Sequence, residues 1–297
     1  MLTSNIIKLR SYVDKAIVKA DHNYSDFNKN YSLSIQLSLD GFSLSFLNTE
    51  SNKYLAFESY AIQEIDDYEV LAKELGNLLD QLDLIKRRFS RVNILFEGSK
   101  STLVPQPLFD ENFLKDYFKF SHTLNYDEEI RFDKLSNLQA FNVYALPKPI
   151  HELIKARFIN YNIQHSLSSL IEGLLVKFKN QEISDRIFVN VRPSYIDILF
   201  FQNSKLLFCN TFRYKTSEDF AYFLLNAIEQ LQLNPETIDL FLMGEIDKSS
   251  QTYELLYKYI RSIEFMERND FFVYSYALDE LPSHYFYNLL NANTCEL

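Results

Sequence analysis

Residues 33–46 read LSIQLSLDGFSLSF, and residues 187–201 read IFVNVRPSYIDILFF. In both stretches apolar side chains alternate on either side of a short turn, which predicts two paired β-strands. Each stretch precedes a third apolar strand, an amphipathic segment and a short apolar run, over residues 53–62, 68–86 and 92–98 in the first copy and 205–214, 216–231 and 238–244 in the second. The chain therefore predicts the order strand, strand, strand, helix, strand twice.

Turn and cap residues separate these elements. Asp40-Gly41 lies between the first two strands, and an Asp-Gly pair predicts a type I′ hairpin turn with positive φ at both residues. Pro193-Ser194 takes the corresponding place in the second copy, where Asn203-Ser204 makes the next turn. Capping residues are predicted at the start of both helices: Asp66 or Asp67 in the first copy, and Thr216 with Asp219 in the second.

The repeat predicts an α/β protein with two βββαβ-type halves around an interdomain cleft, over residues 31–164 and 165–297. A polar lead-in is predicted over residues 1–30. The remaining predicted elements are helices over 110–120, 149–158, 166–178, 253–263 and 283–290, and strands over 140–146 and 271–276. The helix over 166–178 is apolar nearly all round, which predicts burial on most sides.

The composition indicates a globular protein and disfavours nucleic acids as partners. The 297 residues carry a net charge of -10, which disfavours non-specific nucleic-acid binding because phosphates attract Lys and Arg. The basic run KRRFSR at Lys86–Arg91 is typical of a solvated helix end. Cys209 and Cys295 match no disulfide or metal motif, which predicts reduced thiols. The sequence shows neither a membrane-spanning stretch nor a signal peptide, so we predict a cytoplasmic protein.

The duplicated pattern resembles the actin-like ATPase fold, which is a ribonuclease H-like architecture. The middle of the chain is most similar to the branch with pilus-assembly and cell-division members, in which a strand such as AFNVYALP precedes helices such as KPIHELIKARF and HSLSSLIEGLL, and a strand such as RIFVNV opens the second half. The run NSKLLFCNTF also resembles that branch. LSIQLSLDGFSLSF and HYFYNLLNANTCEL are similar to an uncharacterised bacterial family of this fold, a domain of unknown function.

The resemblance implies where ATP and Mg²⁺ would bind. In active members each half has a hairpin with Asp, one residue and Gly, because the acid holds hydrated Mg²⁺ and the glycine lets backbone N–H groups reach the phosphates. Here the first pair maps to Gln36 and Ser38, and the second maps to Asn190 and Arg192, followed by Pro193. The adenosine-binding glycine pair maps to Met243-Gly244. The ATP motifs are therefore degenerate, and we predict no cofactor and no metal.

Three alternatives remain for cleft chemistry. Asp40-Gly41 could be a displaced acid–glycine pair, although a hairpin turn explains it fully. Arg192 could bind a phosphate, since guanidinium suits phosphate geometry. Glu97 beside Gly98 and Glu245 beside Gly244 end the two copies at equivalent points and could form a carboxylate pair. The sequence contains no other phosphate-loop, zinc or nucleophile-elbow motif.

Aromatic residues predict binding surfaces. The chain has 26 Phe and 20 Tyr, concentrated over residues 109–120 and 271–287. Phe113, Tyr117 and Phe120 share one predicted helix face, which would pack on its own sheet or bind a protein partner or a second copy in a homodimer. We therefore predict a protein of unknown function that does not hydrolyse ATP and acts as a scaffold or adaptor. The alternative is a nucleotide-binding ATPase with unusual phosphate-contacting residues.

Overall fold

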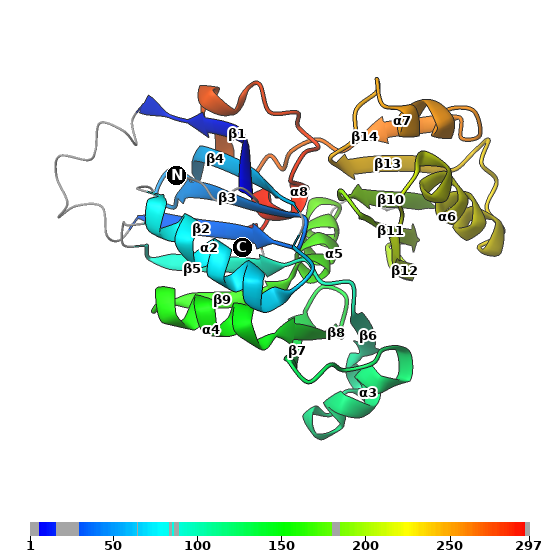
Figure 1. Cartoon of the computed structure of the whole chain (residues 1–297). Coiled ribbons are helices and arrows are strands. Elements are labelled where there is room, and N and C mark those ends of the chain that lie inside the picture. Colours follow the sequence, from blue (N-terminus) through cyan, green and yellow to red (C-terminus); the bar gives the residue numbers. More distant parts are fainter. Residues whose placement is uncertain are drawn as a thin grey trace. The chain divides into compact units, whose positions relative to one another are not determined.

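The structure is a computed structural model that describes residues 6–15, 30–63, 65–82, 85, 89–179 and 185–294. The chain divides into two compact units, which are described separately (Figure 1). The first unit is made from residues within Met1–Gly173, Asp270–Glu280 and Asn288–Leu297, and the second from Leu174–Asn269 and Leu281–Tyr287. Most of the predicted lead-in, Lys86 to Arg88 of the basic run, and Cys295 lie outside the described residues.

A seven-stranded mixed sheet forms the centre of the first unit. Its strands are β1 (Ile6–Val13), β4 (Lys53–Ile62), β3 (Gly41–Asn48), β2 (Tyr31–Leu37), β5 (Arg91–Phe96) and β9 (Tyr161–His165) in spatial order, with β15 (Val273–Tyr274) also paired to β4. Strands β2, β3 and β4 are antiparallel neighbours, whereas β5 runs parallel to β2 and to β9. The three predicted strands of the first copy are thus confirmed as one meander beside a parallel strand.

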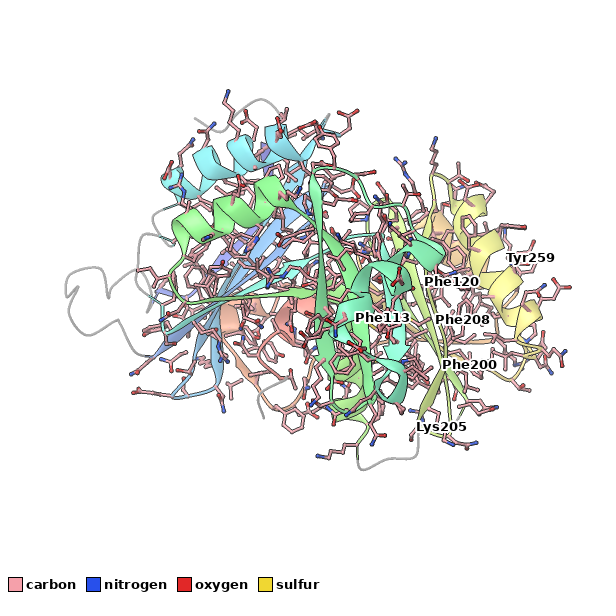
Figure 2. The ribbon with its side chains drawn as sticks, turned by 90° about the horizontal axis from the view of Figure 1, so that it is seen from below. Phe113, Phe120, Phe200, Lys205, Phe208 and Tyr259 are labelled. Carbon is pink, nitrogen blue, oxygen red and sulfur yellow. The ribbon has the colours of Figure 1, made fainter. Side chains whose placement is uncertain are left out.

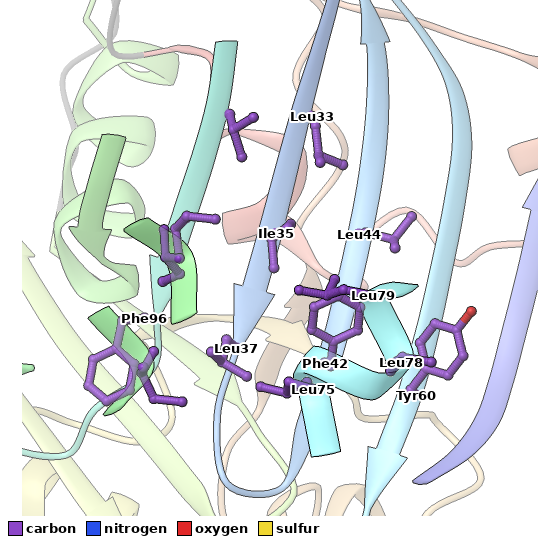
Figure 3. Packing of buried hydrophobic residues seen from close by; sticks show 14 of the residues in the cluster. Leu33, Ile35, Leu37, Phe42, Leu44, Tyr60, Leu75, Leu78, Leu79 and Phe96 are labelled. Carbon is purple, nitrogen blue, oxygen red and sulfur yellow. The ribbon is translucent and has the colours of Figure 1, made fainter. Parts of the chain in front are cut away.

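One face of this sheet is apolar and packs against helices α2 (Tyr68–Gln81) and α4 (Lys148–Arg157) (Figure 1). Alternation along β2 and β3 directs their apolar side chains to this face. The buried cluster includes Leu33, Ile35, Leu37, Phe42, Leu44, Leu75, Leu78 and Leu79 (Figure 3). The carboxylate of Asp67 accepts hydrogen bonds from the backbone N–H groups of Glu69 and Val70, which confirms the predicted cap of α2.

The opposite face of the same sheet carries buried polar side chains that bind the C-terminal segment. Ser32, Ser34 and Asn93 are buried there. The side-chain oxygen of Asn293 accepts hydrogen bonds from Ser32 Oγ and Asn93 Nδ2, both at 2.9 Å. Its Nδ2 donates to Ser34 Oγ at 3.2 Å and to the Tyr54 hydroxyl at 3.3 Å. One asparagine therefore bonds to three strands of this sheet, β2, β4 and β5.

A smaller three-stranded sheet completes the first unit. Its order is β6 (Ser101–Pro105), β8 (Ala140–Pro147) and β7 (Glu128–Leu135), all antiparallel. Two short 3₁₀ turns, η3 (Gln106–Leu108) and η4 (Glu111–Phe113), lead into α3 (Leu114–Ser121). Phe118 of α3 is fully buried against Val104 and Val143. Helix α5 (Ser166–Lys177) follows β9, and the division between the two units falls within it.

The second unit has a five-stranded sheet with the same local order as the first. The strands are β12 (Lys205–Arg213), β11 (Tyr195–Gln202), β10 (Arg186–Val191), β13 (Asp239–Gly244) and β14 (Ser262–Phe265). Helix α6 (Ser217–Gln230) packs on this sheet, and its Thr216–Asp219 capping box is present as predicted. In the sequence, helix α7 (Gln251–Leu256) follows β13 and precedes β14. The 3₁₀ turn η5 (Tyr276–Leu278) and helix α8 (Tyr287–Leu290) come later in the chain.

Several elements differ from the sequence predictions. Residues 6–13 of the predicted lead-in form β1, an edge strand in which only Ile6 is buried and which therefore needs no regular apolar pattern. The helix predicted over 253–263 ends at Leu256, and β14 takes the residues from Ser262. The units also differ in extent from the predicted halves, because the C-terminal segment returns to the first sheet through β15 and Asn293.

The predicted type I′ turn is wrong at Asp40-Gly41 and occurs instead at the next hairpin of the second unit. Neither Asp40 nor Gly41 has a positive φ, whereas Asn203 and Ser204 have φ values of 49° and 62°. Strand β2 ends at Leu37, β3 begins at Gly41, and the register pairs Leu37 with Phe42, so the connection is longer than a two-residue turn. Asn203-Ser204 connects directly paired ends of β11 and β12, which does require it.

Candidate functional site

The hydroxyl of Ser38 organises the β2–β3 turn in the first unit. It accepts hydrogen bonds from the backbone N–H groups of Asp40 at 3.1 Å and Gly41 at 3.0 Å. The N–H of Ser38 donates to the Gly41 carbonyl at 2.9 Å, and Ile62 N–H donates to the Asp40 carbonyl at 3.0 Å. The amide groups that a phosphate would need at this hairpin are therefore bonded within the turn. Asp40-Gly41 lies in this turn and at the start of β3.

Gln36 and Glu97, which the sequence analysis singled out separately, lie together at the ends of β2 and β5. Gln36 Nε2 donates to Glu97 Oε1 at 3.1 Å, and the backbone N–H of Glu97 donates to the Leu37 carbonyl at 2.9 Å. The side-chain oxygen of Gln36 is buried and has no hydrogen-bond partner among the described residues. An amide at position 36 thus binds a neighbouring carboxylate, which an aspartate there would repel.

Gly98 is held by a buried histidine. The N–H of Leu167 can only donate, so His165 Nδ1 accepts from it at 3.2 Å, and Nε2 consequently donates to the Gly98 carbonyl at 3.1 Å. A Cβ at position 98 would lie 2.8 Å from the Phe96 ring. Beside it, Asp133 accepts from the His165 backbone N–H at 2.7 Å, and burial raises the pKa of Asp133 to about 6. This polar cluster was not predicted.

In the second unit a buried carboxylate, Asp197, gathers the groups around the β10–β11 hairpin. Asn190 Nδ2 donates to Asp197 Oδ2 at 2.9 Å. Arg192 Nη2 and Thr211 Oγ1 donate to Oδ1 at 2.9 and 2.7 Å. The side chains of Arg192 and Asp197 are only 6% and 2% exposed, so the ion pair is shielded from water. The predicted positions Asn190 and Arg192 are thus brought together by a residue that the sequence analysis missed.

A charged residue inside an apolar strand was the signal for Asp197. It interrupts the run YIDILFF, where a carboxylate would be buried and would need partners. Arg192 has further contacts: its guanidinium lies 5.2 Å from the centre of the Tyr195 ring, and its carbonyl accepts from the Tyr214 hydroxyl at 2.7 Å. Nearby Cys209 is a free thiol whose pKa is raised by burial and by the Asp197 carboxylate.

Gly244 closes the end of β13 with a backbone that only glycine fits. Its φ is +86°, and a Cβ there would lie 2.1 Å from the Val191 carbonyl oxygen. The N–H of Gly244 donates to the His284 carbonyl at 2.8 Å, and the N–H of Glu245 donates to the Val191 carbonyl at 2.9 Å. His284 Nε2 bonds to the Ile246 carbonyl at 2.7 Å, and burial lowers the pKa of His284.

Glu97 and Glu245 belong to different units, so the carboxylate pair stays a prediction. An open depression of about 400 Å³ in the second unit is lined by residues that follow α7 and by Glu236, and it contains none of the predicted site positions. In the described chain, no group of three or more His, Cys, Asp or Glu side chains is placed to hold a metal ion. No helix of the described residues is both long and apolar enough to cross a membrane.

The predicted aromatic surfaces are only partly exposed. Phe113 and Phe120 are 51% and 93% exposed around α3 (Figure 2). Tyr117 instead packs against the Phe109 ring and donates to the Leu108 carbonyl at 2.6 Å. In the second aromatic segment, the Phe272 ring packs edge-on against Tyr54, 5.2 Å away.

Comparison with known proteins identifies the fold. A Bacteroides thetaiotaomicron protein with an actin-like ATPase fold and unknown function is 28% identical, with a TM-score of 0.72 over 82% of this chain and 94% of that chain. A chain of the PilM–PilN type IV pilus biogenesis complex is 13% identical, with a TM-score of 0.62 over 88% of this chain and 97% of that chain. These likenesses confirm the predicted actin-like ATPase fold.

The family follows from a comparison with family models. No curated protein matches this chain. The model described as "Protein of unknown function (DUF3822)" matches residues 21–263, which is most of the sequence. This match confirms the predicted resemblance to a family of unknown function. The chain therefore belongs to the DUF3822 family, and its fold is that of the actin-like ATPases.

Proposed function

We propose that this protein is a pseudo-ATPase that does not hydrolyse ATP and acts as a cytoplasmic scaffold or adaptor by binding another protein. One observation carries the proposal: the groups at both degenerate hairpins are bonded to each other within their own unit. The Ser38 hydroxyl accepts hydrogen bonds from two backbone N–H groups of its turn, and the Asp197 carboxylate accepts hydrogen bonds from Asn190 and Arg192. A carboxylate thus holds the cation that a phosphate would otherwise use.

The energetic argument concerns the Arg192–Asp197 ion pair. For Arg192 to bind a nucleotide phosphate, it would have to leave Asp197 and expose a buried charge without a partner. Breaking one side of a buried pair costs about 3–5 kcal/mol. That cost would weaken nucleotide binding by about two to four powers of ten. Pro193, which has no N–H to donate, follows at the position where the hairpin turns.

Protein binding is the positive half of the proposal. The large exposed rings of Phe113 and Phe120 support it, because exposed aromatic residues are enriched at protein interfaces. A chain of the PilM–PilN complex, which has the same fold, is part of an assembly of two proteins, and this supports the proposal. A homodimer is the alternative arrangement for these surfaces.

Thermal unfolding with and without Mg-ATP tests the proposal. A ligand at about 100 times its Kd stabilises a protein by about 2.7 kcal/mol, which raises the Tm by several degrees. We expect a shift below about 1 °C at millimolar Mg-ATP, with Mg²⁺ alone as the control. A shift of several degrees that disappears in Arg192→Met would instead establish nucleotide binding through Arg192, and phosphate release from ATP would then have to be measured to establish the rival function, a nucleotide-binding ATPase.

A further inference from the structure

Strand β12 leaves one side of its backbone unpaired. It is the edge of the five-stranded sheet, and β11 is its neighbour among the described strands. The Tyr214 N–H donates to the Ser194 carbonyl, so Tyr214 is at a hydrogen-bonded position of the β11–β12 ladder. Hydrogen-bonded positions alternate along an antiparallel strand, so the N–H and C=O groups of Cys209, Thr211 and Arg213 point away from β11. The Thr211 N–H accordingly bonds to the Asn210 side chain at 2.9 Å instead of β11.

An apolar shelf lies along the same edge. The rings of Phe212 and Phe223 stack with centres 4.9 Å apart, and Tyr222 packs edge-on against Phe223 at 5.6 Å. Phe208 is also half-buried against this cluster (Figure 2). Tyr222 is 64% exposed, and Leu207, where the strand register shifts, is 55% exposed. An added strand would therefore cover apolar side chains as well as gain backbone hydrogen bonds.

The charge of β12 has one sign. Lys205 and Arg213 stand at its two ends, both are exposed, and the strand contains no Asp or Glu. The chain as a whole has a net charge of -10, so this cationic edge is a local exception. Opposite charges across paired strands stabilise a sheet, and like charges destabilise it. The edge therefore suits an extended segment with carboxylates near both ends.

We infer that β12 is the docking edge for an extended segment of another protein, with alternating apolar residues and acidic ends. This inference deepens the proposed protein-binding function and rests on it. A second copy of this chain fits less well. The antiparallel register that pairs all of β12 with itself places Lys205 of one copy opposite Arg213 of the other, and these like charges repel.

The test uses a fluorescent peptide of the same length as β12, with alternating Val and Thr between Asp and Glu ends, and a second peptide with Lys ends. We expect the folded wild-type chain to bind the acidic peptide at least about tenfold more tightly. Cys209→Pro removes an outward N–H without touching the β11 ladder and should abolish binding. Cys209→Ala keeps that N–H and is the matched control, for which we expect unchanged binding.

Two further measurements decide the outcome. If Cys209→Pro does not fold, Lys205→Glu/Arg213→Glu should reverse the preference toward the Lys-ended peptide, and unchanged preference would overturn the inference. No binding of the acidic peptide at millimolar concentration, or equal binding by folded Cys209→Pro, would also overturn it. A wild-type dimer that Cys209→Pro converts to monomer in sedimentation would assign the edge to a second copy. The Mg-ATP melts do not involve β12, so either result can fail alone.

Discussion

Gly244→Ala is a substitution for which the structure predicts a large loss of stability. At φ +86°, an L-residue other than glycine costs about 1–2 kcal/mol in backbone strain. The new Cβ would also lie 2.1 Å from the Val191 carbonyl oxygen. The backbone at one of these two residues would have to move to relieve this contact. Separating the two segments would weaken the Glu245–Val191 and Gly244–His284 backbone hydrogen bonds, each worth about 1 kcal/mol. We therefore expect a total loss of about 3–4 kcal/mol.

Urea unfolding followed by far-ultraviolet circular dichroism measures this loss. With a slope of about 2 kcal/mol per molar, the midpoint should fall by more than about 1 M. The matched control is Gly76→Ala in α2, where a new Cβ would lie 3.4 Å from Leu153 in ordinary contact. Alanine is the better helix former, so this control should be neutral or stabilising by up to about 1 kcal/mol. A loss below about 1 kcal/mol in Gly244→Ala would refute the reasoning from backbone geometry.

Two other perturbations test the buried charges. Asp197→Asn removes the partner of the Arg192 guanidinium and should lower the free energy of unfolding by about 3 kcal/mol. The double variant Asp197→Asn/Arg192→Met also removes the buried charge and should recover part of that loss. A double variant less stable than the single variant would contradict this expectation. Burial raises the pKa of Asp133 from 3.8 to about 6, so the folded chain binds the proton of this carboxyl more tightly than the unfolded chain does. The stability that this provides is fully present below pH 4 and is lost as the pH rises through 6. Asp133→Asn should remove about 2 kcal/mol of that pH dependence in urea titrations, since partial exposure reduces the full effect, and an unchanged pH profile would count against it.

The elements that sequence alone predicts well are those whose burial produces a regular pattern. Strands β2, β3, β10 and β11 each alternate or are nearly continuous in apolar residues, and the caps of α2 and α6 are local hydrogen bonds that short motifs encode. Strand β1 escapes because an exposed edge strand needs no apolar periodicity. Its place in the sheet depends on pairing with β4, about fifty residues later.

The hairpin positions can be selected from the sequence, whereas their hydrogen-bond partners cannot. Sequence mapping selects Gln36, Ser38, Asn190 and Arg192 as substitutions of the acid–glycine pairs. It does not reveal that Asp197 lies directly opposite Asn190, because strand register is a tertiary property. It also predicts a two-residue turn at Asp40-Gly41, because the hydrogen bonds of the Ser38 hydroxyl become visible only in the folded hairpin.

The hydrogen bonds of Asn293 have a consequence for folding of the chain during synthesis. The first unit is assembled from both ends of the sequence, and the entire second unit is translated before Asn293 reaches Ser32, Ser34 and Asn93. On the ribosome, Ser32, Ser34 and Asn93 therefore cannot bond to Asn293 until the second unit has been translated, and water can satisfy them until then. The second unit is more nearly continuous in sequence, and completion of the first unit depends on a segment that is translated after the second unit.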